Sequence, residues 1–485
     1  MVPAVGRDCR LTRPSLLSCN TKPQPRAFHT NPQSNSQNQS QWHRLNHKTY
    51  SRPLDAYEKV FHALCYEPSH RSLDIFTTCA LETEHTTSEI LDASKKVWRK
   101  MRYAHPTLDV DVMPDEYRYT VPCGPSMMED WVERTFIIQD GNSGLEAGKL
   151  VTIPRRAEKP MMYYFPSEKR FILTIEHMLI DGRGVRLFMC EFLSDLSSIL
   201  SGEAIIDSGE EWGSEVGKLP LGALQVAELD NVNGDGCNTL LSTLPEFKPN
   251  REAFIFPTVS RPHEAGVAKV QTIEFTKQQT LLISAAAKQF GYGAAAFLHT
   301  AILHAARIVC PVAGNKLNST FVIFDSRGVC QAAQNDRPCP PVAIRFSLWP
   351  VQLEMADDLH QTASVVNEAY KTVTRRRPAA VASAPEALLK SGSILKPEFD
   401  RGLFPSFLGD TMKSAKYEAF RVREFWMDAL PADEKVFLGV QTFDGRLSIR
   451  AAYSSQFYED EPVGELLRGI QSELRAVLGG GLSSF

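Results

Sequence analysis

Three kinds of feature are scarce in this sequence, and each scarcity excludes a class of protein. No apolar run reaches the ~18 residues of a membrane-spanning helix, since the nearest candidate, residues 295–309, contains His299, His304 and Arg307. Positive charge is not in excess: the formal net charge is −4, so no basic patch favours a nucleic-acid partner. None of the ten cysteines lies in a C-x-x-C pair or a zinc-type cluster, which predicts free thiols in a reducing compartment.

The first fifty residues differ in composition from the rest. They contain seven Lys or Arg residues against one acid, Asp8, and residues 31–40 form a low-complexity tract of Asn, Gln and Ser. Such a tract buries too little apolar surface to offset its ordering entropy, so residues 1–41 are predicted to be a disordered tail. A mitochondrial transit peptide is the alternative, because residues 26–30 resemble a processing site. Several prolines oppose the helix that such a peptide needs, and a cytoplasmic location is expected.

The remaining chain is long enough for two hydrophobic cores, because one core stops growing at roughly 250–300 residues. Residues 42–202 are predicted to form an N-terminal lobe, and residues 267–485 a C-terminal lobe. Between them, residues 203–266 are rich in acids and contain a turn signal at 233–236, which predicts an irregular crossover. Strands and helices are mixed without strict alternation, so the expected fold class is α/β (α+β), with two sandwich-type lobes.

Hydrophobic periodicity predicts the individual elements. Helices are expected at residues 55–64, 88–101, 184–200, 278–290, 294–308 and 462–478. Strands are expected at residues 74–81, 118–121, 132–138, 150–153, 170–177, 319–325, 342–348, 436–442 and 447–453. Thr276 and Gln279 form a capping box, which marks the start of the helix at 278–290.

The segment from residue 171 to residue 184 carries the chemical signal of the sequence. Apolar and polar residues alternate up to His177, which predicts that this histidine ends a half-buried strand on its apolar face. An abrupt turn follows at Asp181 and Gly182, and apolar residues at helical spacing then predict a helix. An imidazole held rigidly at a strand end can be aimed, and its ordinary pKa near 6.5 lets it accept a proton at neutral pH.

A single histidine on an apolar strand face is more often a satisfied core residue than a catalytic one. The added aspartate at +4 and glycine at +5 favour the catalytic interpretation, because this combination is rare by chance. The other histidines give no comparable signal. His299 and His304 are five residues apart and face different sides of a helix, so buried packing is expected there and no metal site is predicted.

The pattern His177-x-x-x-Asp181-Gly182 resembles the signature of the coenzyme-A-dependent acyltransferase superfamily. This superfamily includes chloramphenicol acetyltransferases, plant BAHD enzymes and peptide-synthetase condensation domains, and the likeness is nearest to the fungal trichothecene 15-O-acetyltransferase type. Further stretches are similar to the patterns of the superfamily over about residues 42–480. They lie at residues 42–58, 324–327, 405–410 and 447–458.

The resemblance implies a fold and a set of roles. Two chloramphenicol-acetyltransferase-like lobes would enclose a channel, with His177 as the general base at its centre. Asp181 would point away from the substrate and pair with an arginine; Arg327, in the aspartate-x-arginine element, is the candidate, and a plain surface charge is its alternative. Gly182 would allow a tight reversal without a Cβ clash. Ser406 or backbone amides would stabilise the oxyanion.

The same resemblance implies the reactants. Acetyl-CoA or another acyl-CoA would be a co-substrate with no permanently bound cofactor, and the acceptor would be a hydroxyl of a small terpenoid or polyketide metabolite. The enzyme would be a monomer. No acyl-enzyme is expected, because the sequence contains no Gly-x-Ser-x-Gly elbow and no cysteine with an evident base beside it.

Two departures from the superfamily narrow the assignment. Condensation domains usually carry a second histidine before the catalytic one, where this chain has Glu176. The Asp-Phe-Gly-Trp-Gly block of plant enzymes is missing, with residues 423–428 only a remote counterpart. The leading hypothesis is an O-acyltransferase; the alternatives are a condensation-like enzyme acting on a carrier-bound or polyketide thioester and a non-catalytic binding protein on the same fold.

Overall fold

The computed structural model describes residues 41–66, 74–139, 159–203, 211–226, 256–259, 266–310, 317–333, 339–375, 402–412, 414–431 and 434–479. The predicted tail at 1–41, except its last residue, lies outside the described residues. So do the strand predicted at 150–153 and most of the crossover predicted at 203–266.

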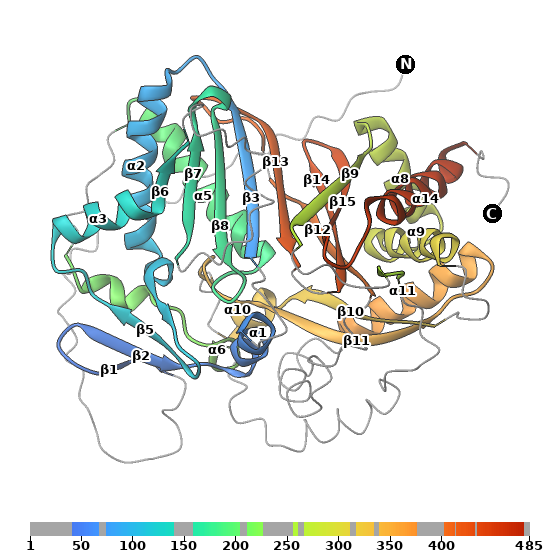
Figure 1. Cartoon of the computed structure of the whole chain (residues 1–485), viewed down its shortest axis with the longest axis horizontal. Helices are drawn as coiled ribbons and strands as arrows, with labels where there is room; N and C mark the ends of the chain where they lie inside the picture. Colours follow the sequence, from blue (N-terminus) through green and yellow to red (C-terminus); the bar gives the residue numbers. More distant parts are fainter. Residues whose placement is uncertain are drawn as a thin grey trace, which may run out of the picture. The chain divides into compact units, whose positions relative to one another are not determined.

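A five-stranded sheet carries the segment with His177. Its strand order is β13-β3-β8-β7-β6, and only the β6–β7 pair is parallel. In Figure 1, helices α2, α3 and α5 lie alongside this sheet. The strands are β3 (Asp74–Glu82), β6 (Phe136–Ile138), β7 (Met161–Phe165), β8 (Arg170–Glu176) and β13 (Arg421–Leu430), and the helices are α2 (Thr87–Ala104), α3 (Pro125–Thr135) and α5 (Gly182–Leu200).

A four-stranded sheet, in the order β12-β14-β15-β9, forms the centre of the second lobe, with β12 parallel to β14. In Figure 1 its helices lie on the side of the sheet away from the first lobe. The strands are β9 (Ala268–Glu274), β12 (Gly402–Asp410), β14 (Lys435–Phe443) and β15 (Arg446–Ser454). The helices are α8 (Lys277–Gln289), α9 (Ala294–Val309), α11 (Leu359–Arg375) and α14 (Asp460–Gly479).

Two smaller antiparallel sheets lie beside the main ones. The first has the order β1-β2-β5-β4 and the second joins β10 to β11. Their strands are β1 (His43–Arg44), β2 (Thr49–Pro53), β4 (Asp111–Val112), β5 (Glu116–Thr120), β10 (Leu317–Asp325) and β11 (Phe346–Glu354). Short helical segments connect the strands: α1 (Ala56–Tyr66), α6 (Ala223–Val226), α10 (Arg327–Ala333) and the 3₁₀ turns at Pro106–Asp109, Pro166–Glu168 and Ser214–Lys218.

The predicted α/β class with mixed sheets and helices is confirmed. One strand crosses the predicted boundary between lobes: β13 comes from the segment 267–485, yet it pairs antiparallel with β3 along its whole length. Local patterning carries no signal for a partner that lies over 300 residues away, so the sequence placed this segment in the second lobe only.

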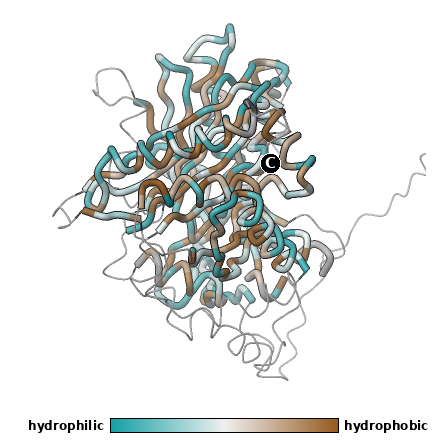
Figure 2. Tube along the Cα trace, turned by 90° about the vertical axis from the view of Figure 1, so that its right-hand side faces the viewer, coloured by the Kyte–Doolittle hydropathy of each residue, from teal (hydrophilic) through white to brown (hydrophobic). Residues whose placement is uncertain are grey.

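Strand β8 is buried on both faces, and the prediction of a half-buried strand was wrong. One face, with Phe171, Leu173 and Ile175, packs into the large core under the helices. Ile172 on the other face joins a second cluster with residues of the other sheet, including Ala452 and Phe437. The sheets of the two lobes therefore pack against each other here, and Figure 2 shows apolar segments gathered inside the trace.

Two predicted strands differ from the structure. Residues 125–135 form helix α3, which begins with Pro125 at its first position and packs Thr135 against Trp98 of α2, so only residues 136–138 are extended. Strand β11 begins at Phe346 rather than at residue 342, because the backbone N–H of Arg345 binds a side chain of the first lobe, Asp181. The capping box of Thr276 and Gln279 is present.

Among the described residues, no single helix has the length and hydropathy needed to cross a membrane. Helices α8 and α9 reach that limit only together, as a pair bent by 102°.

One buried ion pair connects the two large sheets. The guanidinium of Arg450 in β15 donates from Nε and Nη2 to the carboxylate of Asp428 in β13, at 2.8–2.9 Å. The Asp428 side chain is fully buried, and the guanidinium also lies 4.0 Å from the ring centroid of Trp426.

Arg450→Met is expected to lower the free energy of unfolding by about 3–5 kcal/mol, because it leaves the Asp428 carboxylate buried without its counter-charge. Arg468→Met is the matched control, since its pair with Glu461 is exposed on both sides and such pairs contribute roughly 0–1 kcal/mol. Denaturant titration of both variants measures the difference. Equal losses in the two variants would contradict the role of the pair.

Candidate active site

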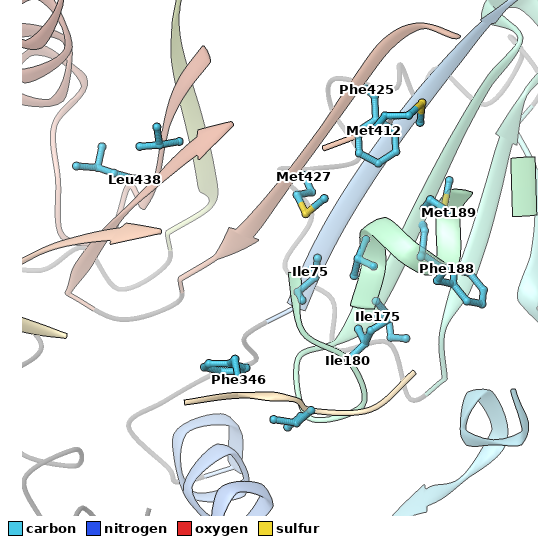
Figure 3. Packing of buried hydrophobic residues seen from close by; sticks show 14 of the residues in the cluster. Ile75, Ile175, Ile180, Phe188, Met189, Phe346, Met412, Phe425, Met427 and Leu438 are labelled. Carbon is cyan, nitrogen blue, oxygen red and sulfur yellow. The ribbon is translucent and has the colours of Figure 1, made fainter. Parts of the chain in front are cut away.

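The turn between β8 and α5 is fixed by contacts from three directions. The N–H of Leu179 donates to the carbonyl of Glu176 at 2.9 Å, and the hydroxyl of Tyr117 in β5 donates to the carbonyl of Met178 at 2.8 Å. Figure 3 shows Ile175 and Ile180 packed beside Ile75 at the end of β3. The backbone that carries His177 is therefore held on a rigid base.

His177 follows the last residue of β8 and is partly exposed. Its imidazole stacks on Phe61 of α1, with ring centroids 4.8 Å apart and planes 26° apart. From the second lobe, Phe346 of β11 also contacts the imidazole, and the centroids of these two rings are 5.6 Å apart. Next to these rings, the hydroxyl of Tyr57 in α1 hydrogen-bonds that of Ser347 in β11. Both lobes thus contribute aromatic rings that contact the imidazole.

Burial lowers the pKa of His177 below its ordinary value of 6.5, because the charged imidazolium loses hydration. Backbone groups of His177 and Ile180 and the carboxylate of Asp181 oppose this lowering only in part. Within the described residues, the buried Nδ1 atom makes no hydrogen bond of good geometry. At neutral pH the ring is therefore uncharged, which is the form that accepts a proton.

The carboxylate of Asp181 is buried and receives three hydrogen bonds. As the N-cap of α5, its Oδ1 accepts from the N–H of Gly184 at 2.7 Å. The same oxygen accepts from Nη1 of Arg327 at 3.0 Å, and Oδ2 accepts from the N–H of Arg345 at 2.6 Å. With these donors the carboxylate connects the motif to the second lobe, and it is not available to a substrate.

Arg327 begins α10 and is 5% exposed, so its alternative as a surface charge was wrong. Its Nη1 also donates to Oδ1 of Asp325 at 3.2 Å. Burial alone would lower the pKa of the guanidinium, but the carboxylates of Asp181 and Asp325 outweigh it and raise that pKa. Only one guanidinium nitrogen reaches Asp181, because the other carboxylate oxygen is taken by the backbone of Arg345.

Two glycines in the motif are required because other atoms approach their Cα atoms closely. A left-handed backbone conformation is not the reason. Neither Gly182 nor Gly184 has a positive φ. The predicted tight reversal at Gly182 therefore does not need a backbone conformation that other residues would avoid. A Cβ on Gly182 would lie 2.9 Å from Cδ2 of Leu408, whereas a Cβ on Gly184 would lie 2.2 Å from the carbonyl oxygen of Pro341. The second contact is with backbone, which cannot move aside easily.

Ser406, the candidate oxyanion donor, lies in β12 and is buried. No hydrogen bond among the described residues joins it to His177. Leu408, two residues later on the same strand, approaches the start of α5, so β12 borders the motif without bringing the serine hydroxyl into contact with the imidazole.

Sequence reasoning missed several residues at this site. Phe61 and Phe346 come from distant segments and carry no motif, and Arg345 acts through its backbone, which no side-chain pattern reveals. Gly184 stood in the motif segment but was assigned no role. In the part of the chain that the structure describes, no group of three or more His, Cys, Asp or Glu side chains is arranged to hold a metal ion.

Gly184→Ala is expected to reduce the free energy of unfolding by about 1–3 kcal/mol, because the new methyl group overlaps the Pro341 carbonyl. Gly182→Ala should cost less, since the end of the Leu408 side chain can rotate away. Gly217→Ala is the control, because a Cβ there meets no atom within 4 Å. Thermal and denaturant unfolding rank the three variants, and a Gly184 variant as stable as the Gly217 variant would show the contact to be absent.

Asp181→Ala is expected to cost about 3–5 kcal/mol of stability, because it leaves the buried Arg327 guanidinium without its main counter-charge. Asp325→Ala is the matched control, because it removes the other carboxylate that binds Arg327. The Asp325 side chain is 40% exposed, so its loss should lower the free energy of unfolding by no more than ~1 kcal/mol. Denaturant titration distinguishes them. The account fails here if the two substitutions are equally destabilising.

Comparisons with known proteins support the fold described above. No protein-family profile matches the chain. A curated protein, the acetyltransferase pigO of Monascus ruber, is 24% identical over 197 residues. That match covers 39% of this chain and 41% of the relative, so the chain spans less than half the length of the curated relative that it matches.

Solved structures match over nearly the whole chain. The TRI3 trichothecene 15-O-acetyltransferase of Fusarium sporotrichioides aligns with a TM-score of 0.71 at 14% identity, covering 90% of this chain and 98% of that one. Polyketide synthase associated protein 5 of Mycobacterium tuberculosis aligns with a TM-score of 0.64 at 14% identity, and the match covers 88% of this chain and 98% of that one. The first condensation domain of the calcium-dependent antibiotic synthetase aligns with a TM-score of 0.64 at 13% identity, and the match covers 91% of this chain and 97% of that one.

Identities this low show a shared fold, and the fold is the one that the histidine motif predicted. This chain shares its two-lobed fold with the TRI3 trichothecene 15-O-acetyltransferase and with the condensation domain, and this is the fold that the resemblance in the sequence implied.

Proposed function

We propose that the protein is an O-acyltransferase that moves an acyl group, in the first instance acetyl, from coenzyme A to a hydroxyl of a small metabolite. One observation carries the proposal. His177 is a partly exposed imidazole at the meeting point of the two lobes, and burial lowers its pKa, while the neighbouring carboxylate, Asp181, is fully occupied by donors. A base is thus presented next to a residue that only positions it.

The proposed reaction is a direct transfer between two bound reactants. The imidazole of His177 takes the hydroxyl proton as the alcohol oxygen attacks the thioester carbonyl. The resulting tetrahedral oxyanion collapses, the carbon–sulfur bond breaks, and the imidazolium returns the proton to the leaving thiolate. Positioned base catalysis contributes about 10²–10⁴-fold, and holding both reactants together contributes further. The protein carries no permanently bound cofactor in this scheme.

Stabilisation of the oxyanion requires a donor aimed at the carbonyl oxygen, worth roughly 3–4 kcal/mol for one such group. Ser406 stays the side-chain candidate, and backbone N–H groups are the alternative. The hydroxyl would have to reach a bound thioester rather than His177 itself, so its lack of contact with the imidazole is compatible with this role.

The proposed acceptor is a hydroxylated terpenoid or polyketide. Support comes from relatives named as a trichothecene 15-O-acetyltransferase, a polyketide synthase associated protein and an acetyltransferase. The aromatic rings of Phe61 and Phe346 around the imidazole favour an apolar acceptor over a charged one.

Condensation on a carrier-bound thioester is the second candidate, because condensation domains share the fold at a TM-score of 0.64. Against it, Glu176 stands where those domains usually have a second histidine, and its side chain is buried. Offering the protein acetyl-CoA and an acetylated carrier protein in parallel distinguishes the two. Transfer from the carrier alone would overturn the coenzyme A assignment.

His177→Ala is expected to abolish transfer, with a loss of at least about 10²-fold, while the thermal unfolding temperature stays within a few degrees of the parent. His85→Ala is the matched control, because this histidine makes only a half-exposed contact with Glu89. Product formation from labelled acetyl-CoA and a panel of hydroxylated metabolites measures both. Retained turnover in the His177 variant would refute the mechanism.

The rate should depend on pH through His177. Since the base must be uncharged and burial lowers its pKa, kcat/KM is expected to fall only as the pH drops below 6.5. Phe61→Ala admits water to the ring and should move this acid limb upward, toward the ordinary pKa. An acid limb above pH 6.5 in the parent protein would show that another group is titrating.

A further inference from the structure

Strand β12 contains one residue more than the strand beside it, and this irregularity lies next to the start of helix α5. Phe407 pairs with Val440 of β14, but the next pair is Gly409 with Gln441, so Leu408 is left over as a β-bulge. Gly409 has a φ of +67°, in the left-handed region that favours glycine. A bulge bends its strand and changes the direction in which the local side chains point.

The two faces of this strand end are identified by their contacts. The ring of Phe407 packs on His299 of α9 and Tyr370 of α11, with centroids 5.9 and 6.2 Å apart. Those helices lie on the side of the sheet away from the first lobe (Figure 1). Successive side chains of a strand point to opposite faces, so Ser406, the residue before Phe407, faces the first lobe.

The bulge contacts the start of helix α5 at two points. The side chain of Leu408 reaches the helix, because a Cβ on Gly182 would lie 2.9 Å from its Cδ2 atom. Two residues further along β12, the carbonyl oxygen of Asp410 accepts a hydrogen bond of 2.7 Å from Nη1 of Arg186. Gly182 and Arg186 are four residues apart and thus lie on one side of the helix. The bulged end of β12 therefore lies along the first turn of α5.

Other contacts hold the bulged end of β12 in its own sheet and connect that sheet to the first lobe. The N–H and the hydroxyl of Thr411 both donate to the carbonyl of Thr442 in β14, at 2.9 and 3.0 Å. Opposite the bulge, the side-chain amide of Gln441 binds both backbone groups of Met427 in β13, at 3.1 and 3.3 Å. Because β13 belongs to the sheet of the first lobe, Arg186 acts at a point where both sheets already meet.

The position of Arg186 is unfavourable for a cation in other respects. The residue is partly buried, and Arg183 lies one turn earlier on the same helix; both effects lower the pKa of the Arg186 guanidinium. Like charges at this spacing also destabilise a helix. The bond to the carbonyl of Asp410 is the printed contact that offsets this loss, which points to the strand end as the purpose of this arginine.

We propose that Arg186 is a positioning residue for acyl transfer: by holding the carbonyl of Asp410, it keeps the bulged end of β12 against the turn of His177. This inference rests on the proposed function, in which Ser406 on the same strand end is the candidate oxyanion donor. Arg186 contacts neither reactant in this scheme. It fixes the gap between the helix that follows the imidazole and the strand that carries the hydroxyl, so that both groups reach one bound thioester.

Arg186→Met keeps most of the side-chain length but removes its donors, and it is expected to lower kcat about 10–100-fold, as for a catalytic group misplaced by roughly 1 Å. The KM for acetyl-CoA should stay near that of the parent, because the lost interaction acts only in the transition state. Arg186→Lys keeps a donor and the charge and should recover most of the loss. Labelled acetyl-CoA with the acceptor found in the metabolite panel measures all variants.

Arg183→Met is the matched control. Its side chain is 46% exposed, and its Nε lies 3.8 Å from the nearest carboxylate oxygen, that of Asp325. This substitution removes a cation from the same helix without touching β12, so kcat should be unchanged. A thermal melt first shows that each variant is folded.

Hydrogen exchange followed by mass spectrometry gives a second readout, which needs no activity. Peptides from residues 403–412 should exchange faster in Arg186→Met than in the parent, because the strand end loses its contact with α5. Arg186→Lys and Arg183→Met should exchange these peptides at the rate of the parent. Unchanged exchange in the Arg186→Met protein would show that the contact is absent and would overturn the proposal.

The kinetic outcome decides between positioning and a merely structural contact. A Met variant whose kcat equals that of the parent, or whose loss appears in KM alone, overturns the positioning role, since a structural contact would lower stability without slowing the transfer step. A parent protein that transfers no acyl group would overturn the proposed function and, with it, this role. Faster exchange in the variant would then show that the failure lies in the reaction and not in the contact.

Discussion

A single buried carboxylate organises the candidate active site. Asp181 caps helix α5 in the first lobe and binds the backbone and a side chain of the second lobe with its two oxygens. Removing such a charge from water is costly unless hydrogen-bond donors replace the lost hydration. Here one donor, Gly184, is three residues away, whereas Arg327 and Arg345 lie 146 and 164 residues further along the chain. The turn of His177 can therefore keep its shape only when both lobes are in place.

This dependence explains why the motif contains residues whose contacts are all with other parts of the protein. The glycine at position 184 lets the Pro341 carbonyl approach, and the arginine at position 327 neutralises the carboxylate. The imidazole of His177 itself is contacted by the apolar rings of Phe61 and Phe346. In the proposed mechanism, positioning and chemistry are thus divided: the charged residues fix the backbone, and the imidazole would carry the proton.

Much of this site was predictable from the sequence, because short-range patterns determine it. Alternation along β8, the turn at Asp181 and the helical spacing after it placed His177 at a strand end, and the resemblance suggested the contact of Asp181 with Arg327 that the structure contains. What escaped prediction is long-range or made by backbone. The pairing of β13 with β3, the N–H of Arg345 and the aromatic neighbours of His177 leave no local pattern.

The central claim, direct transfer with His177 as base, is tested most directly by the fate of the acyl group. Purified protein is mixed with acetyl-CoA that carries a labelled acetyl group, with and without an extract of hydroxylated metabolites, and label on the protein and on small molecules is followed separately. The account predicts labelled ester only when acceptor is present, with no label on the chain at any time. Label that stays covalently attached to the protein, or an absence of transfer to any alcohol, would contradict it.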